Sequence, residues 1–292
     1  MATLAEWVEG ARPRTLPAAL SPVVAGSAVA WFWHGFVPLL AALALVVALA
    51  LQVAVNYAND YSDGIRGTDA ARVGPLRLVG SGAATPRAVK AAALVCFGVA
   101  AVAGLVIVLL TGHWWLLAVG AAAIAAAWFY TGGTHPYGYL GLGELFVFLF
   151  FGLVAVTGTT YIQLGSVPLS GWWTAVAIGA LACAILVANN LRDLTGDAAS
   201  GKRTLATRLG DRGTRWFFFG LVVVAGLGVV GVAATSSRWA LLGLFMLAAL
   251  VGPTWSVLQG AHGRELISVL KRVGQAELTC ALGLFVGLII AR

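Results

Sequence analysis

The chain has 292 residues, of which 60% are hydrophobic and only 10% are charged, and its mean hydropathy is +0.93. Soluble domains are closer to half apolar and a quarter charged, so the composition excludes an ordinary soluble protein. The net charge is +7, yet no nucleic-acid-binding motif accompanies it, and we expect no nucleic-acid partner. The lipid bilayer is the expected environment.

Apolar stretches long enough to cross roughly 30 Å of hydrocarbon recur along the chain. They predict nine membrane-spanning helices, at residues 16–33, 37–57, 88–110, 114–130, 140–164, 172–188, 216–235, 239–258 and 276–290. Several of the eleven tryptophans fall at the ends of these segments, as an interfacial aromatic belt predicts. No cleavable signal peptide is expected, because no apolar segment follows a basic start. The predicted fold is an all-α polytopic membrane protein with a single domain over residues 1–292.

Lys and Arg indicate the orientation. The N-terminal segment and the loops after spans two, four, six and eight carry sixteen of the eighteen basic residues, and the other two are Arg238 and Arg292. The positive-inside rule then puts the N-terminus and these loops in the cytoplasm and the C-terminus outside a cell membrane. All eleven acidic residues lie on or near the same face. This one-sided distribution disfavours a cation-coupled transporter, which needs polar sites near the midplane.

The stretch NYANDYSDGIRGTD (residues 56–69) follows span two and concentrates acids at the membrane edge. If the span continues as a helix, Asn56, Asp60 and Asp63 fall at i, i+4 and i+7, on one face. Asn59 is also four residues before Asp63. Like charges one turn apart repel, more so near lipid, and a bound cation would relieve the repulsion.

A second loop, NNLRDLTGDAASGKRTLATRLG, follows span six and repeats the pattern, which suggests an internal duplication. Asn189, Asp193 and Asp197 lie at i, i+4 and i+8. Oxygen ligands beside cationic side chains suit Mg²⁺ bridging to a phosphate. The neighbouring basic residues are Arg66, Arg72, Arg77, Arg192, Lys202 and Arg203. The simpler alternative is that these charges are solvated loop residues that set topology.

The two acidic motifs resemble those of the UbiA superfamily of intramembrane aromatic prenyltransferases. Five segments resemble sequences of the branch that prenylates 1,4-dihydroxy-2-naphthoate in menaquinone synthesis. They span most of the chain and occur in the same order as in that family. They are RPRTLPAALSPV, NDYSDGIRGTD, RLVGSG, YTGGTHPYGYLGLGE with the following FFGLVAVTGT, and NNLRDLTGDAASGKRTLATRLG.

The resemblance implies nine helices around a central cavity, capped by cytoplasmic loops at about residues 56–87 and 189–215. It implies that Mg²⁺, as two ions, is held by motif residues against the diphosphate of a polyprenyl donor. The implied metal ligands are Asn59, Asp60, Asp63, Asp193 and Asp197, of which the four aspartates are the catalytic candidates. The implied diphosphate-binding residues are Arg66, Arg77, Lys202 and Arg203. The chain departs from the commonest pattern at Gly67, where relatives have a further Asp, so that the next acid is Asp69. It departs again at Thr134, where many relatives have Lys.

The resemblance also implies the reaction: a polyprenyl group passes to the aromatic acid with loss of CO₂, giving demethylmenaquinone and diphosphate. Aromatic faces stabilise a developing allylic cation, and no dedicated strong base is required. The candidates for positioning the substrates are Arg14, Asn56, Asp69, Tyr130, His135, Tyr137, Tyr139, Glu144, Asn189 and Asn190. Structural or topological roles remain open for Arg14, with its neighbour Arg12, and for His135 and Glu144.

Three alternatives remain open. The acceptor could be another aromatic acid, such as 4-hydroxybenzoate or homogentisate, because such enzymes share the metal motifs. A CDP-alcohol phosphatidyltransferase also uses helix-borne aspartates and a divalent metal, although its acids are expected in one compact motif. The cation-coupled transporter is the third.

Overall fold

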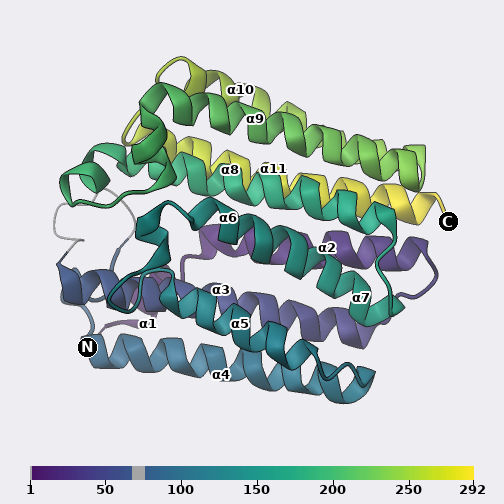
Figure 1. The fold of residues 1–292 in the computed structure, drawn as a ribbon, viewed down its shortest axis with the longest axis horizontal. Helices are drawn as coiled ribbons and strands as arrows, with labels where there is room; N and C mark the ends of the chain where they lie inside the picture. The colour runs from purple at the N-terminus through teal and green to yellow at the C-terminus, as the bar shows by residue number, and fades with distance from the viewer. Residues whose placement is uncertain (1, 68–75) are drawn as a thin grey trace.

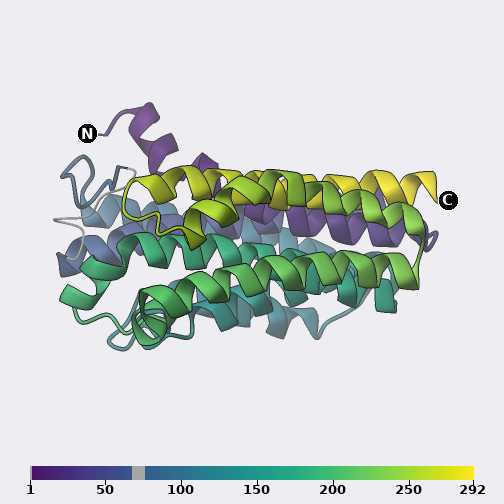
Figure 2. The same ribbon diagram turned by 90° about the horizontal axis from the view of Figure 1, so that it is seen from above.

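The computed structural model describes residues 2–67 and 76–292, and every regular element within them is helical. The elements are α1 (Leu4–Gly10), η1 (Pro13–Thr15), α2 (Leu16–Phe32), α3 (Pro38–Arg66), α4 (Pro86–Thr111), α5 (Leu116–Phe129), η2 (Tyr137–Leu140), α6 (Gly143–Val147), η3 (Phe148–Thr157), α7 (Gly158–Leu164), α8 (Leu169–Ala199), α9 (Leu205–Thr235), η4 (Arg238–Phe245), α10 (Met246–Leu258) and α11 (Glu265–Ile290). The long helices run side by side along one axis (Figures 1 and 2).

Within the described residues, eight helical stretches are long and apolar enough to cross a bilayer. They correspond to eight of the nine predicted spans, and α6, η3 and α7 together form one of them. The remaining span, predicted at residues 114–130, corresponds to α5, which has 14 residues. At about 1.5 Å per residue it is roughly 21 Å long, shorter than the hydrocarbon layer. The prediction of an all-α polytopic membrane protein is confirmed, with a helix count close to nine.

The two helices that carry the acidic motifs continue well past the predicted ends of their spans. α3 has 29 residues and ends where Gly67 adopts a left-handed φ of 72°, the conformation that glycine supplies most cheaply at a helix C-terminus. α8 has 31 residues and reaches Ala199. Each motif therefore lies on a rigid helical extension of a span, which fixes the direction of its side chains.

The helices pack in two groups. One hydrophobic core contains residues of α2, α8, α9, α10 and α11. A second contains residues of α1, α3, α4 and α5. Figure 1 shows α3, α4 and α5 on one side, α8 to α11 on the other, and α2, α6 and α7 between them. Small residues allow close contact: a Cβ added at Gly152 would lie 2.7 Å from the Cα of Gly179. η3 and α8 therefore meet through their backbones, as helices in membranes often do.

The C-terminal ends of α3 and α8 lie at one end of the bundle, together with α1, while the C-terminus of the chain lies at the other end (Figure 1). Thr85 and Thr204 each accept a hydrogen bond from a backbone N–H in the first turn of α4 and α9, which satisfies a donor that the helix itself cannot pair. Both acidic motifs, at the C-terminal ends of α3 and α8, lie at this same end of the molecule (Figure 1).

Candidate active site

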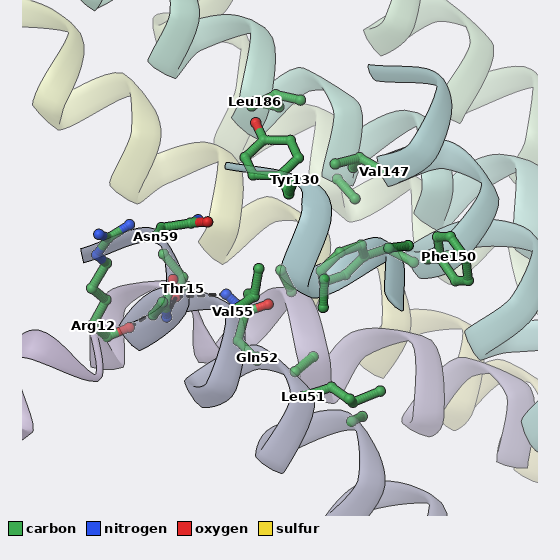
Figure 3. Close-up of a pocket in the computed structure, with 18 of the residues that line it drawn as sticks. Arg12, Thr15, Leu51, Gln52, Val55, Asn59, Tyr130, Val147, Phe150 and Leu186 are labelled. Carbon is green, nitrogen blue, oxygen red and sulfur yellow. Dashed lines mark hydrogen bonds between the residues drawn. The ribbon is translucent and has the colours of Figure 1, made fainter. Parts of the chain in front are cut away.

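A cavity of about 1970 Å³ opens between the two groups of helices. One end, which we call the polar mouth, is lined by Arg12, Arg14, Asn56, Asn59, Asp63, Arg77, Asn189, Asn190, Arg192, Asp193, Asp197 and Lys202. Apolar side chains of α4, α5, η3 and α7 line the interior. In the part drawn in Figure 3, Arg12, Thr15, Gln52 and Asn59 lie toward one end and Phe150 toward the other. The cavity therefore joins a charged entrance to a long apolar chamber.

The extension of α3 directs Asn56, Asn59 and Asp63 into the cavity. Asp63 Oδ1 accepts a 2.6 Å hydrogen bond from the Tyr139 hydroxyl, and Asp63 Oδ2 lies 3.6 Å from Arg77 Nη2. The Oδ1 atom of Asn59 accepts a hydrogen bond of 2.7 Å from Thr131 Oγ1. The first motif thus contacts both the loop after α5 and the segment before α4.

Asp60 differs from the expectation that it faces the cavity with Asp63. Its side chain is fully buried and is not among the residues that line the cavity. Its two carboxylate oxygens accept backbone hydrogen bonds from Leu78, at 2.7 Å, and Val79, at 3.0 Å. At about 100° per residue, Asp60 is roughly 60° around the helix from Asp63, whereas Asn59 is only about 40° away on the other side. This rotation turns Asp60 toward the loop.

The second motif presents Asn189, Asp193 and Asp197 to the cavity along one stripe of α8, as their spacing predicts. Arg192 donates to both carboxylate oxygens of Asp193, at 2.8 and 2.7 Å, and to Asn189 Oδ1 at 2.8 Å. Lys202 Nζ lies 3.7 Å from Asp197 Oδ1. The acids of the polar mouth therefore stand beside cationic side chains, an arrangement suited to an anionic ligand that arrives with a metal.

The expected diphosphate-binding residues separate into two kinds. Arg77 and Lys202 line the cavity. Arg66, which is not among the lining residues, donates to the carbonyl oxygens of Thr131 and Gly133 and so holds the loop after α5. Arg203 has an exposed side chain, and its backbone N–H donates to the Tyr139 carbonyl at 3.0 Å. Each of these two arginines therefore secures backbone close to the mouth.

Aromatic side chains form a row from the polar mouth into the cavity. The ring centres of Tyr130 and Tyr137 are 5.5 Å apart, those of Tyr137 and Phe146 are 4.1 Å apart, and Phe150 follows at 6.2 Å from Phe146. All four line the cavity, as does Tyr139. Burial raises the pKa of the Tyr137 phenol, so the group stays protonated and donates to the Ala126 carbonyl at 2.8 Å.

Two of the other predicted residues do not line the cavity. Glu144 is 5% exposed and accepts a 2.8 Å hydrogen bond from Asn190 Nδ2, so it orients an amide that does line the cavity. His135 is exposed, beside Thr134. Asp69 and Arg72 lie outside the described residues.

Thr15, Gln52 and Lys271 are among the polar lining residues that the sequence did not single out. Gln52 Nε2 donates to Thr15 Oγ1 at 3.0 Å, and Asn56 Nδ2 donates to the same oxygen at 3.1 Å. A lone glutamine four residues before Asn56 in an apolar span is a signal that points to Gln52. Lys271 gives no such signal, because only tertiary packing brings α11 to the cavity.

The oxygen donors at the polar mouth fit a hard divalent cation, which binds few carboxylates and keeps waters or phosphate oxygens as its other ligands. Within residues 2–67 and 76–292, no three His, Cys, Asp or Glu side chains converge on one point. A cation at the mouth would therefore take protein ligands from one or both acidic helices and complete its shell with solvent or substrate.

A helical membrane protein with a charged mouth and an apolar chamber is built to bind an amphiphilic anion. Residues 19–272 match the UbiA prenyltransferase family. A relative from Mycobacterium tuberculosis, named 1,4-dihydroxy-2-naphthoate octaprenyltransferase, is 55% identical over 97% of this chain and 96% of its own. A relative of the same name from Escherichia coli is 34% identical over 98% and 96%. The chain belongs to the UbiA prenyltransferase family and is a membrane prenyltransferase.

Solved structures show the same fold. A UbiA homolog from Aeropyrum pernix superposes with a TM-score of 0.71 at 16% identity, over 96% of this chain and 98% of that one. A homolog from Archaeoglobus fulgidus, solved with GPP and Mg²⁺, gives a TM-score of 0.69 at 14% identity, over 97% and 99%. The helical bundle is thus shared by proteins in which few residues are identical.

Proposed function

We propose that the protein transfers a polyprenyl group from polyprenyl diphosphate to 1,4-dihydroxy-2-naphthoate, with loss of CO₂. The observation that carries this proposal is the cavity itself. Acidic and basic side chains line its mouth, which suits a metal-bound diphosphate, and apolar side chains line its chamber, which suits a prenyl chain. The names of the bacterial relatives support the naphthoate acceptor.

Mg²⁺ is the proposed cofactor, with Asn59, Asp63, Asp193 and Asp197 as the residues that hold it and Asn189 in support. All five line the cavity and carry side-chain oxygens, and oxygen is the ligand that Mg²⁺ prefers. When bound, the metal neutralises the leaving diphosphate and so lowers the barrier to breaking the allylic C–O bond. Two ions are proposed, as the family resemblance implies. A homolog structure bound to DMAPP and Mg²⁺ supports the cofactor.

The cationic side chains of the mouth bind the diphosphate oxygens in this proposal. Arg77, Arg192 and Lys202 line the cavity beside the acids, and Arg–phosphate contacts are strong and directional. As the C–O bond lengthens, positive charge develops on the allylic carbon while the pair of bonding electrons leaves with diphosphate. The row formed by Tyr130, Tyr137, Phe146 and Phe150 offers aromatic faces to that charge and excludes water from the chamber.

The acceptor ring attacks the allylic carbon through the ring carbon that bears the carboxylate. A C–C bond forms, the C–CO₂ bond breaks, and its electrons return to the ring, which restores aromaticity. The product is the prenylated naphthalenediol, the reduced form of demethylmenaquinone. No base has to remove a proton from the attacked carbon, in keeping with the exposure of His135. Arg12 and Arg14, at the start of η1, are proposed to bind the acceptor carboxylate until CO₂ leaves.

The proposed orientation puts the polar mouth on the cytoplasmic side of the membrane. There it can receive the diphosphate of the donor and the carboxylate of the acceptor. The excess of Lys and Arg at this end supports it, and the C-terminus then lies outside the cell.

A competition assay tests the acceptor. Purified protein in lipid nanodiscs would receive one polyprenyl diphosphate, Mg²⁺ and equal amounts of 1,4-dihydroxy-2-naphthoate, 4-hydroxybenzoate and homogentisate. We expect the prenylated naphthalenediol to dominate. A dominant prenylated hydroxybenzoate or homogentisate product would contradict the proposed acceptor while leaving the family assignment intact.

A further inference from the structure

Asp60 lies behind the wall of the polar mouth. Its side chain is fully buried, and both of its oxygens accept backbone N–H groups from the segment before α4. A carboxylate that accepts two N–H bonds forms charge-assisted interactions, which are stronger than neutral ones. The geometry is that of an anchor between α3 and the loop that follows it.

The anchored segment fits α3 closely on both sides of these hydrogen bonds. Leu78 is fully buried in a cluster with Tyr57, Ala58 and Val89. Val79 packs on Gly64: a Cβ added at Gly64 would lie 2.4 Å from Val79 Cγ1. Burial of the Leu78 side chain and pairing of its N–H therefore fix the same short stretch of backbone.

Arg77 directly precedes this anchored pair, and its guanidinium lines the cavity 3.6 Å from Asp63. The side chain of Arg77 is long and loses much rotamer freedom when it is held in place. Its position at the mouth depends on where the backbone of residues 77–79 is fixed, and Asp60 is the α3 side chain that binds this backbone.

We propose that Asp60 is a positioning residue and not a metal ligand: it fixes residues 77–79 on α3 so that Arg77 faces the leaving diphosphate. The acidic motif on α3 then has two functions. Asn59 and Asp63 face the substrate, and Asp60 holds the loop that supplies a cation to it. The inference rests on the proposed function for its kinetic readout, but the anchor itself can be measured without turnover.

The kinetic test compares Asp60→Asn with Asp63→Asn in the full-length protein in nanodiscs. Asn keeps the volume of Asp60 but offers one acceptor oxygen where two N–H groups need partners. We expect Asp60→Asn to raise the KM for polyprenyl diphosphate about tenfold, the scale of one hydrogen bond to a charged group, and to leave the Mg²⁺ concentration for half-maximal rate within about twofold. A shift of that Mg²⁺ concentration as large as the one in Asp63→Asn would overturn the proposal.

A double-mutant cycle with Arg77→Ala gives an independent outcome, because residues that act through each other are not additive. If Asp60 acts through Arg77, adding Asp60→Asn to Arg77→Ala changes the KM by less than about twofold. Multiplication of the two single effects would overturn the proposal. Glu265→Gln, at an exposed carboxylate of α11 that does not line the cavity and whose hydrogen-bond partner His262 is also exposed, serves as the control and is expected to behave as wild type.

Hydrogen exchange separates failure of the anchor from failure of the proposed function. In Asp60→Asn the amides of Leu78 and Val79 are expected to exchange at least about tenfold faster than in wild type, and in Asp63→Asn to stay protected. This readout needs no substrate. If the wild-type protein shows no turnover, the proposed function fails. Hydrogen exchange then still shows whether Asp60 anchors the Leu78 and Val79 backbone. Unchanged protection of both amides in Asp60→Asn and in Asp60→Ala would overturn it.

Discussion

The Tyr139 hydroxyl donates a 2.6 Å hydrogen bond to Oδ1 of Asp63. On its other side, the Tyr139 ring lies 4.6 Å from Lys202 Nζ, which is 3.7 Å from Asp197 Oδ1. Tyr139, which belongs to η2 in the connection after α5, therefore contacts Asp63 of α3 directly and reaches Asp197 of α8 through Lys202. The two motifs, 130 residues apart by the numbering of Asp63 and Asp193, are held in one site by an aromatic residue between them.

Replacing Tyr139 with Phe tests this link. The change removes the hydrogen bond to Asp63 and keeps the ring beside Lys202, so we expect kcat/KM to fall about tenfold or more, the value of one hydrogen bond to a charged group. Tyr139→Ala removes the ring as well and should cost more. Tyr161→Phe, on α7 and outside the cavity lining, is the control. A rate for Tyr139→Phe within twofold of wild type would show that the link is dispensable.

The acids that face the cavity are expected to be indispensable. Asp63→Asn or Asp193→Asn should lower kcat at least about a hundredfold, the usual loss when a transition-state charge contact is removed, while the protein stays folded and inserted. Turnover of each variant would be measured beside its circular dichroism spectrum and its membrane fraction. Near-normal turnover in both variants would contradict the assignment of the metal ligands.

Removal of divalent metal should abolish activity without unfolding the protein. Asp63, Asp193 and Asp197 stand beside Arg77, Arg192 and Lys202, so their charges are compensated when the metal leaves. We expect a chelator to stop turnover, added Mg²⁺ to restore it, and the thermal unfolding midpoint to stay unchanged. Activity that persists after exhaustive chelation would contradict the metal-dependent reaction.

The apolar chamber should set which donors are accepted. Gly158 lines the cavity, and a Cβ added there meets no atom within 4 Å, so the first atom of a side chain fits there without a clash. Gly158→Phe should raise the KM for long polyprenyl diphosphates and leave that for geranyl diphosphate unchanged. Gly98→Phe is the matched control, because Gly98 also has open space around its Cβ position but does not line the cavity. Equal effects of Gly158→Phe on long and short donors would contradict this role.

Membrane orientation can be read from the two ends of α8. Ser200 follows its C-terminal end and Ser166 precedes its N-terminal end, and both are exposed. In a cysteine-free background, a membrane-impermeant maleimide applied to intact cells should label Ser166→Cys and spare Ser200→Cys. The reverse pattern would put the polar mouth outside the cell.

The sequence predicts the fold well, because the length and apolarity of spans are local properties. All nine predicted spans correspond to helical segments, although α5 is shorter than expected. The stripe formed by Asn189, Asp193 and Asp197 also faces the cavity, since a continuous helix fixes the relative directions of its side chains.

Spacing alone does not predict which edge of a helix faces a partner. Asp60 and Asn59 flank Asp63 on opposite sides of α3, and only the tertiary structure shows that the Asp60 side faces the Leu78–Val79 backbone and not the cavity. Arg66 is similar: its charge suggests diphosphate binding, but two loop carbonyls accept its hydrogen bonds. Lys271 reaches the cavity through contacts of α11 with distant helices, which no local pattern encodes.

The most direct measurement of the central claim is the stoichiometry of products from 1,4-dihydroxy-2-naphthoate labelled in its carboxylate. With purified protein, polyprenyl diphosphate and Mg²⁺, we predict that labelled CO₂, diphosphate and prenylated naphthalenediol appear in equal amounts, and that none appears after chelation. Diphosphate release without CO₂ and without a prenylated product, or no Mg²⁺-dependent release at all, would contradict the account.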